Sequence, residues 1–264
     1  MINQKKRNNL LLISRLQLLI LFLLYPGCVT ESDPNERKWE ITLLNVHNLN
    51  INDPSGLTVD ASGDFLWTVS DMEGGHIYKI SFEGHILGRL PYEGNDMEGI
   101  TMNPNDHTLW VAEERLRQAV QLDTLGNVLQ VVNVPVESTN INDGLEGIAI
   151  NPENEHLYIL NEKNPRAFIE LNREMEVVRY ELLNFEMPYF MQDLGGLFFD
   201  HINDHFWVVS DESAKIVVMD KNLNPFQYFD LPLTKFEGIA IDLTKDIIYL
   251  VNDEENKLYV YQLE

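Results

Sequence analysis

Acidic residues recur at corresponding positions in five similar segments of this 264-residue chain. In each segment an apolar run with a Trp or Tyr ends in an acid, as in FLWTVSD (65–71) and IIYLVND (247–253). The acids that end these runs are Asp71, Glu114, Glu162, Asp211 and Asp253. A second column opens the segments EGITMN, EGIAIN and EGIAID, and consists of Glu98, Glu146 and Glu237. Clustered carboxylates raise each other's pKa and suit a hard cation, for which calcium is the first candidate.

The segments that carry these acids are copies of one repeat. Their glycines stand at positions 56, 99, 147, 196 and 238, with steps of 43, 48, 49 and 42 residues. Each repeat holds short strand-like runs separated by turns rich in Asn, Asp, Gly and Pro. Four antiparallel strands in a repeat of this length are typical of a propeller blade. We therefore predict an all-β fold, a single five-bladed β-propeller, with six blades as the alternative.

The fifth repeat ends at Glu264, after its third strand-like run. A strand-like run outside the repeats, WEITLLNV (39–46), lies near the other end of the chain. Pairing of the two would complete the last blade and remove two exposed sheet edges. We therefore expect an N-terminal strand to close the ring.

Blade geometry predicts that the acids gather. The first strand of an antiparallel blade begins on the face where the second strand ends, and it lies nearest the axis. The two columns therefore share one face, and a third set precedes the glycines: Asp53, Asp96, Asp143 and Asp193, with Lys235 in the fifth repeat. Up to twelve carboxylates would surround one opening, and Asn161 and Asn252 would add oxygens. The predicted metal ligands are Glu98, Glu146, Glu237, Asp71, Glu114, Glu162, Asp211 and Asp253.

A purely structural interpretation stays open for the acids that end the second strands. A further column at the start of the third strands holds His76, Gln118, Arg166, Lys215 and Lys257. Four of these residues can carry a positive charge. Ion pairs between the two columns would hold the blades together without any metal.

The N-terminal segment indicates export. Lys5, Lys6 and Arg7 precede an apolar run to Tyr25, which is the pattern of a signal peptide. The single cysteine, Cys28, follows at the place where bacterial lipoproteins carry their lipid. We expect a signal peptide at 1–27, a lipidated Cys28 with an acidic tether at 28–38, and the propeller at 39–264. The protein would then be a monomer attached by its lipid to the cell membrane or outer membrane, facing outside the cytoplasm.

The charge of the chain excludes some partners. Residues 1–28 hold four basic and no acidic residues, so the remainder has 15 basic against 42 acidic residues, a net charge of −27. Such a protein repels nucleic acid and attracts cations. The chain has no G-x-S-x-G motif, and turn roles are favoured for Ser70 and Ser210 beside their acids.

Three motifs carry a family resemblance: DMEGI (96–100), FEGIAID (236–242) and YLVNDEENKLYVY (249–261). Over residues 40–264 the chain resembles the SdiA-regulated family, NHL-related bacterial β-propellers. The resemblance implies an envelope location, a response to calcium and, more distantly, phytase-like activity. The axial acids it implies are Glu98, Glu146 and Glu237. Ser55 and Gly195 depart from the pattern, so a full ring of five glutamates is not available.

Three functions follow from these patterns. The first is binding of a cation, or of a ligand or partner, on the acidic face of an envelope propeller. The second is a calcium-dependent, phytase-like phosphoester hydrolase. The third is a metal-free scaffold for another envelope protein. Non-enzymatic binding is favoured over catalysis.

Overall fold

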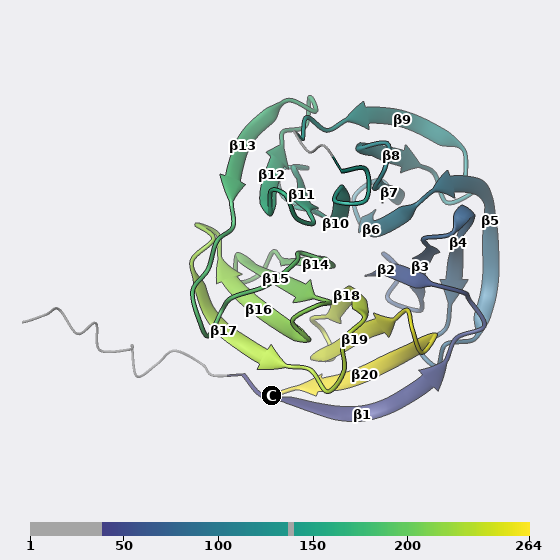
Figure 1. Ribbon diagram of the computed structural model, residues 1–264. Helices are drawn as coiled ribbons and strands as arrows, with labels where there is room; N and C mark the ends of the chain where they lie inside the picture. Colours follow the sequence, from purple (N-terminus) through teal and green to yellow (C-terminus); the bar gives the residue numbers. More distant parts are fainter. Residues whose placement is uncertain (1–38, 137–139) are drawn as a thin grey trace, which may run out of the picture. The chain divides into compact units, whose positions relative to one another are not determined.

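A computed structural model describes residues 39–136 and 140–264 (Figure 1). The signal peptide, Cys28 and the acidic tether lie outside the described residues and stay predictions. Within the described part the chain forms twenty strands and no helix. It accordingly contains no helix that could cross a membrane.

The strands form five four-stranded antiparallel sheets arranged in a ring (Figure 1). Blade 1 consists of β2 (Pro54–Val59), β3 (Leu66–Ser70), β4 (Glu73–Ile80) and β5 (Ile86–Asn95). Blade 2 consists of β6 (Met97–Asn103), β7 (Thr108–Glu113), β8 (Gln118–Leu122) and β9 (Val128–Asn133). Blade 3 consists of β10 (Leu145–Ile150), β11 (Leu157–Asn161), β12 (Ala167–Leu171) and β13 (Val177–Leu182). Blade 4 consists of β14 (Leu197–Asp200), β15 (His205–Ser210), β16 (Lys215–Asp220) and β17 (Pro225–Asp230).

Blade 5 joins the two ends of the described chain. It consists of β18 (Phe236–Asp242), β19 (Ile247–Asn252), β20 (Lys257–Leu263) and β1 (Ile41–Asn48), the last from the N-terminal side. Ile41 stands opposite Leu263, and Asn48 opposite Lys257. The backbones of Glu40 and Glu264 exchange two hydrogen bonds of 3.0 Å beyond the strands. The predicted closure and the count of five blades are confirmed, and the six-bladed alternative is wrong.

Aromatic residues at one repeat position fill the space between neighbouring blades. The column consists of Trp67, Trp110, Tyr158, Trp207 and Tyr249, all buried. Each large side chain buries its apolar surface on one face of its blade, against the neighbouring blade. Tyr158, for example, has its ring centroid 4.8 Å from that of Phe206 in the next blade. The same repeat position thus supplies the core at every blade boundary.

The repeat glycines bring the five innermost strands together at the axis. The residue that directly precedes a repeat glycine is here called the head residue. A Cβ added to any repeat glycine would lie closer than 3.0 Å to the backbone oxygen of the head residue in the following blade. For Gly99 that oxygen belongs to Glu146, and for Gly238 it belongs to Ser55, which closes the cycle. The space left at the axis is about 10 Å³, room for one water molecule at most. The glycine ring therefore separates the two faces of the propeller.

Candidate metal centre

Most of the predicted acids meet in one cavity at the axis. This cavity, here called the acidic cup, has a volume of about 170 Å³. Its lining consists of Asp71, Glu98, Glu114, Asn142, Glu146, Glu162, Asp193, Gly195, Asp211, Lys235, Glu237 and Asp253. All eight predicted ligands are among them. The antiparallel order of the strands explains the convergence, because the innermost strands begin where the second strands end.

A β-bulge at the head of the innermost strands places the glutamates. In blade 5 Phe236 pairs with Asn252 and Ile239 with Leu250, so that Glu237 and Gly238 face a single residue. Equivalent register shifts occur between Met97 and Gly99 and between Leu145 and Ile148. A bulge leaves one residue out of the ladder and re-aims its side chain. Glu98, Glu146 and Glu237 owe their position at the cup to this irregularity.

The third set of acids is only partly gathered. Asp193 lines the cup, whereas Asp53, Asp96 and Asp143 do not. The Asp53 backbone is left-handed, with φ of 47°, and its carbonyl accepts a hydrogen bond from the Asp71 N–H. Asp143 is buried and accepts a hydrogen bond from the side chain of Asn164. Nine carboxylates therefore line the cup, fewer than the twelve that the sequence allowed.

The three head glutamates, Glu98, Glu146 and Glu237, have strongly raised pKa values. Burial raises the pKa of Glu98 well above its ordinary value, and the charges of Asp71 and Glu237 raise it further. Burial likewise raises the pKa of Glu146, with contributions from Glu98 and Glu237. The pKa of Glu237 is raised by burial and then by Asp211. Without a bound cation, these side chains favour the protonated form.

Two acids at the ends of second strands share this behaviour. Burial raises the pKa of Glu114 to about 8, assisted by a hydrogen bond with Asp96. Burial raises the pKa of Asp71 to about 6, with added repulsion from Asp53 and Asp96. The N–H of Gly144 donates a hydrogen bond of 3.1 Å to Glu114 and fixes its carboxylate. Glu114 is thus both held in place and short of positive charge.

Oxygen atoms come within metal-binding distance in two groups that share Glu114. One group consists of Asp96, Glu98 and Glu114, and the other of Glu114, Glu146 and Glu162. In each group the carboxylate oxygens lie within 4.8 Å of one another. Oxygens that bind one calcium ion at about 2.3–2.6 Å lie up to about 5 Å apart. Both groups belong to blades 2 and 3, so the candidate metal centre lies on that side of the cup.

Positive side chains neutralise parts of the cup. Arg115 Nε lies 2.8 Å from Asp96, and Lys163 Nζ lies 2.6 Å from Glu162. Lys235 Nζ lies 2.7 Å from Asp211. Two of these pairs thus involve the outer members of the ligand groups, whereas Glu98, Glu114 and Glu146 have no ion pair among the described residues.

The cations proposed for the structural interpretation do not pair with the second-strand acids. Lys215 donates to the carbonyl of Pro188, and Lys257 lies 3.2 Å from Glu255. Arg166 donates to the backbone oxygens of Met191 and Gln192. His76 contacts the Tyr92 carbonyl instead. That form of the metal-free interpretation is wrong, because the third-strand side chains have other partners.

One lining residue, Asn142, was missed at the sequence level. Asn142 enters the cup from the turn before β10, and Lys235, the fifth member of the third set, enters from the turn before β18. The signal for Asn142 was its place beside Asp143 of that set. Asn161 and Asn252, by contrast, do not line the cup. The side chain of Asn252 donates a hydrogen bond to the Thr234 carbonyl and accepts one from the Glu255 N–H.

The donor set fits a hard divalent cation. The lining offers carboxylate oxygens and one amide, with no thiol and no imidazole among the described residues. Such oxygen ligands suit calcium, which accepts six to eight of them in flexible geometry. One buried oxygen, Asp253 Oδ1, has no hydrogen-bond partner in the described part of the chain. A cation at the blade 2 and blade 3 side would offset the repulsion that helps to raise the pKa values of Glu98, Glu114 and Glu146.

Several solved structures resemble the chain in three dimensions. Glutaminyl cyclase of Myxococcus xanthus is 12% identical, with a TM-score of 0.67 over 86% of this chain and 97% of its own. A chain of a nidogen/laminin complex is 13% identical, with a TM-score of 0.53 over 80% of this chain and 83% of its own. Virginiamycin B lyase of Staphylococcus aureus is 18% identical over 79% of this chain, with a TM-score of 0.49. This chain spans 66% of that lyase's length. The likenesses to the cyclase and to the nidogen/laminin chain show the fold alone.

The family assignment comes from the sequence of the propeller itself. The model of the SdiA-regulated family matches residues 32–262, which includes all five blades. The match contains the head glutamates, the acids that end the second strands and the bulge glycines described above. The chain is a five-bladed β-propeller that belongs to the SdiA-regulated family.

Proposed function

We propose that this protein binds a divalent cation, calcium, in the acidic cup at the blade 2 and blade 3 side. The observation that carries the proposal is the grouping of Glu98, Glu114 and Glu146. Each has a raised pKa, and each contributes oxygens to a group within ligand distance. A bound cation would hold all three in the ionised form, which the cup without a cation disfavours.

The wider role is sensing or binding outside the cytoplasm. The signal-like N-terminus and Cys28 support export and lipid attachment to the cell membrane or outer membrane. Calcium in the cup would set the charge of this face and thereby its affinity for a ligand or an envelope protein. Replacing Cys28 by Ser should move the protein from the membrane fraction to the soluble fraction. Retention of the Cys28→Ser variant in the membrane would contradict the lipid anchor.

Calorimetric titration tests the cation site. Calcium added to the purified, chelator-treated protein should give saturable heat. The double variant Glu98→Gln and Glu146→Gln should bind at least about tenfold more weakly, because calcium affinity follows the number of charged ligands. Glu174→Gln, in the exposed turn between β12 and β13, serves as the matched control. Absence of heat from the unmodified protein would exclude the site, and equal binding by the double variant would place it elsewhere.

Phosphoester hydrolysis is a second candidate. A hollow of about 340 Å³ beside blade 3 is lined by Lys163 and Arg166 among others. Lys163 also contacts Glu162 of the cup, so the hollow adjoins the candidate metal centre. Arg166 is bonded to neutral oxygens only, which leaves its charge for an anion. Calcium-dependent release of phosphate from a phosphomonoester would support this candidate, whereas calcium binding without turnover would leave the binding role alone.

A further inference from the structure

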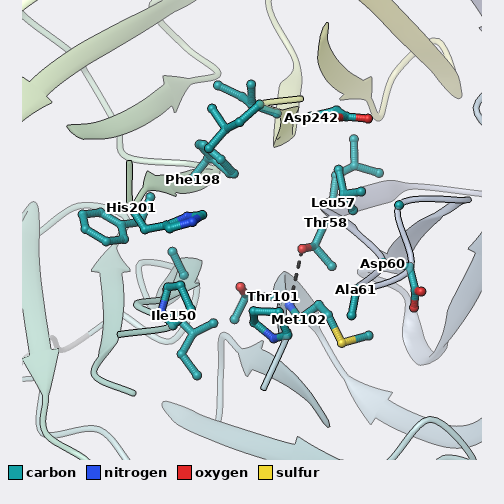
Figure 2. A pocket seen from close by; sticks show the side chains of 18 of the residues that line it. Leu57, Thr58, Asp60, Ala61, Thr101, Met102, Ile150, Phe198, His201 and Asp242 are labelled. Atoms are coloured by element: carbon teal, nitrogen blue, oxygen red, sulfur yellow. Dashed lines mark hydrogen bonds between the residues drawn. The ribbon is translucent and has the colours of Figure 1, made fainter. Parts of the chain in front are cut away.

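A second, larger cavity opens on the face opposite the acidic cup. It has a volume of about 620 Å³ and is lined from all five blades by the far ends of the innermost strands and the turns that follow them (Figure 2). The glycine ring, with its space of about 10 Å³, separates it from the acidic cup. We call it the apolar pocket. Its contents are therefore independent of the cation site.

The lining of the apolar pocket is chiefly hydrocarbon. Its side toward the glycine ring is formed by branched aliphatic residues: Leu57, Ile100, Leu197 and Ile239. Met102, Ile150 and Phe198 add further apolar surface (Figure 2). Cavities that bind small organic molecules usually have about 300–1,000 Å³ and such a lining, with a few polar groups for orientation. The apolar pocket has this size and composition.

The carboxylates of Asp242 and Asp60 beside the pocket are already engaged, and the third acid of the lining, Asp64, is exposed to solvent. Asp242 is 2.7 Å from Lys245 Nζ and also accepts from the Thr244 hydroxyl. Asp60 accepts hydrogen bonds from Ser62 and, at 2.8 Å, from the indole of Trp67. Neither carboxylate needs a charged ligand. The net charge of −23 on the whole chain further disfavours an anion. A neutral occupant fits best.

Two hydroxyl groups at the wall are free to donate. Thr101 is 8% exposed, and no group of the described residues hydrogen-bonds to its hydroxyl. Figure 2 shows its oxygen at the edge of the open centre. Thr58 Oγ1 accepts from the Met102 N–H at 3.3 Å, and its own proton has no acceptor among the described residues. Hydroxyl groups that face a cavity without a protein acceptor can donate to a carbonyl or ether oxygen of a molecule bound there.

We propose that the apolar pocket binds a neutral, largely apolar small molecule that carries a hydrogen-bond acceptor. The apolar body would cover the aliphatic residues near the axis, and the acceptor would take the hydroxyl protons of Thr58 and Thr101. His201 reaches toward the open centre from blade 4 and would lie over the bound molecule (Figure 2). The protein then carries two sites on opposite faces, one for a cation and one for an organic ligand.

Nile red tests the proposal, because it is neutral, apolar and fluorescent and carries a carbonyl acceptor. Its fluorescence should rise and shift to the blue with saturation near one dye per chain. Thr101→Val keeps the side-chain shape and removes the hydroxyl, so binding should weaken about three- to tenfold. Ala61→Trp should fill the mouth of the pocket and remove saturable binding. Chelation of calcium should leave the affinity unchanged.

Thr124→Trp is the matched control for added bulk. Thr124 is exposed in the turn between β8 and β9 and does not line the pocket. Circular dichroism and thermal unfolding establish that each variant is folded, and Thr101→Val decides alone if Ala61→Trp is not. Lack of saturable binding by the unmodified protein would overturn the proposal. Equal binding by Thr101→Val and by a folded Ala61→Trp would also overturn it, since the dye would then bind the surface.

Discussion

The Lys235 ammonium lies 2.7 Å from Oδ2 of Asp211, and the backbone N–H of Lys235 donates a hydrogen bond of 2.6 Å to Oδ1 of the same carboxylate. Lys235 stands where the other repeats carry an aspartate. It is also 3.8 Å from Glu237. One residue therefore brings positive charge to two acids of blades 4 and 5, whereas Glu98, Glu114 and Glu146 have no ion pair among the described residues and are assigned to a cation.

Replacing Lys235 should destabilise the protein without calcium. In Lys235→Met the partly buried Asp211 loses its ion pair, and Glu237 loses a nearby positive charge. Because the lysine side chain is 44% exposed, the free energy of unfolding should fall by about 1–2 kcal/mol rather than by the larger value of a fully buried pair. Urea unfolding in the presence of a chelator measures the change. Lys221→Met, at an exposed ion pair with Asp204, is the control and should change stability by less than about 0.5 kcal/mol.

Stability without calcium should decrease as the pH rises. Asp71 and Glu114 have raised pKa values of about 6 and about 8. Each therefore binds more protons in the folded than in the unfolded chain between its ordinary pKa and its raised one. The contribution of these two carboxyl groups to the free energy of unfolding is fully present below about pH 4. It is lost as the pH rises through about 6 for Asp71 and about 8 for Glu114.

Urea unfolding at pH 5 and pH 8 checks this dependence. With a chelator, the free energy of unfolding should be higher at pH 5 by an amount on the order of a few kcal/mol. Saturating calcium should reverse or flatten the trend, because the cation binds the ionised carboxylates. Greater stability at pH 8 in the chelated protein would show that the carboxylates of the cup are compensated by the protein itself.

The glycine ring should tolerate no side chain. A methyl group at Gly99 would meet the backbone oxygen of Glu146 and the side chain of Ile148. Overpacking against backbone cannot relax by a rotamer change, so Gly99→Ala should cost about 3 kcal/mol or more. In Gly88→Ala, on β5, the added methyl group meets nothing within 4 Å, and stability should stay within about 0.5 kcal/mol. Equal unfolding midpoints for the two variants would contradict the close packing at the axis.

Ring closure should depend on the N-terminal strand. Deleting residues 39–48 removes β1 and the Trp39 ring, which lies 5.2 Å from Trp207. It also exposes the edge of β20. The midpoint of thermal unfolding should fall by about 10 °C or more, with self-association through the open edge. Calorimetry measures the midpoint and light scattering measures the self-association. An unchanged midpoint in a monomeric variant would show that pairing of β1 with β20 does not stabilise the ring.

The sequence alone determined the repeat, the number of blades and the donor of the closing strand. Its periodicity also determined that Glu98 and Glu114 share a face, because strand direction alternates along a blade. What periodicity does not contain is distance across the axis. Thus Asp193 reaches the acidic cup while Asp53, at the same repeat position, does not.

Only the tertiary structure decided which charges meet. Lys235 pairs with Asp211 across a blade boundary. Lys215, by contrast, was a candidate partner of the acids in the sequence, but it donates a hydrogen bond to the Pro188 carbonyl. The sealed axis and the apolar pocket likewise depend on five strands meeting at the axis, and no single repeat encodes that meeting. Local patterns specify strands and turns, but the distances that make a site arise only when the ring closes.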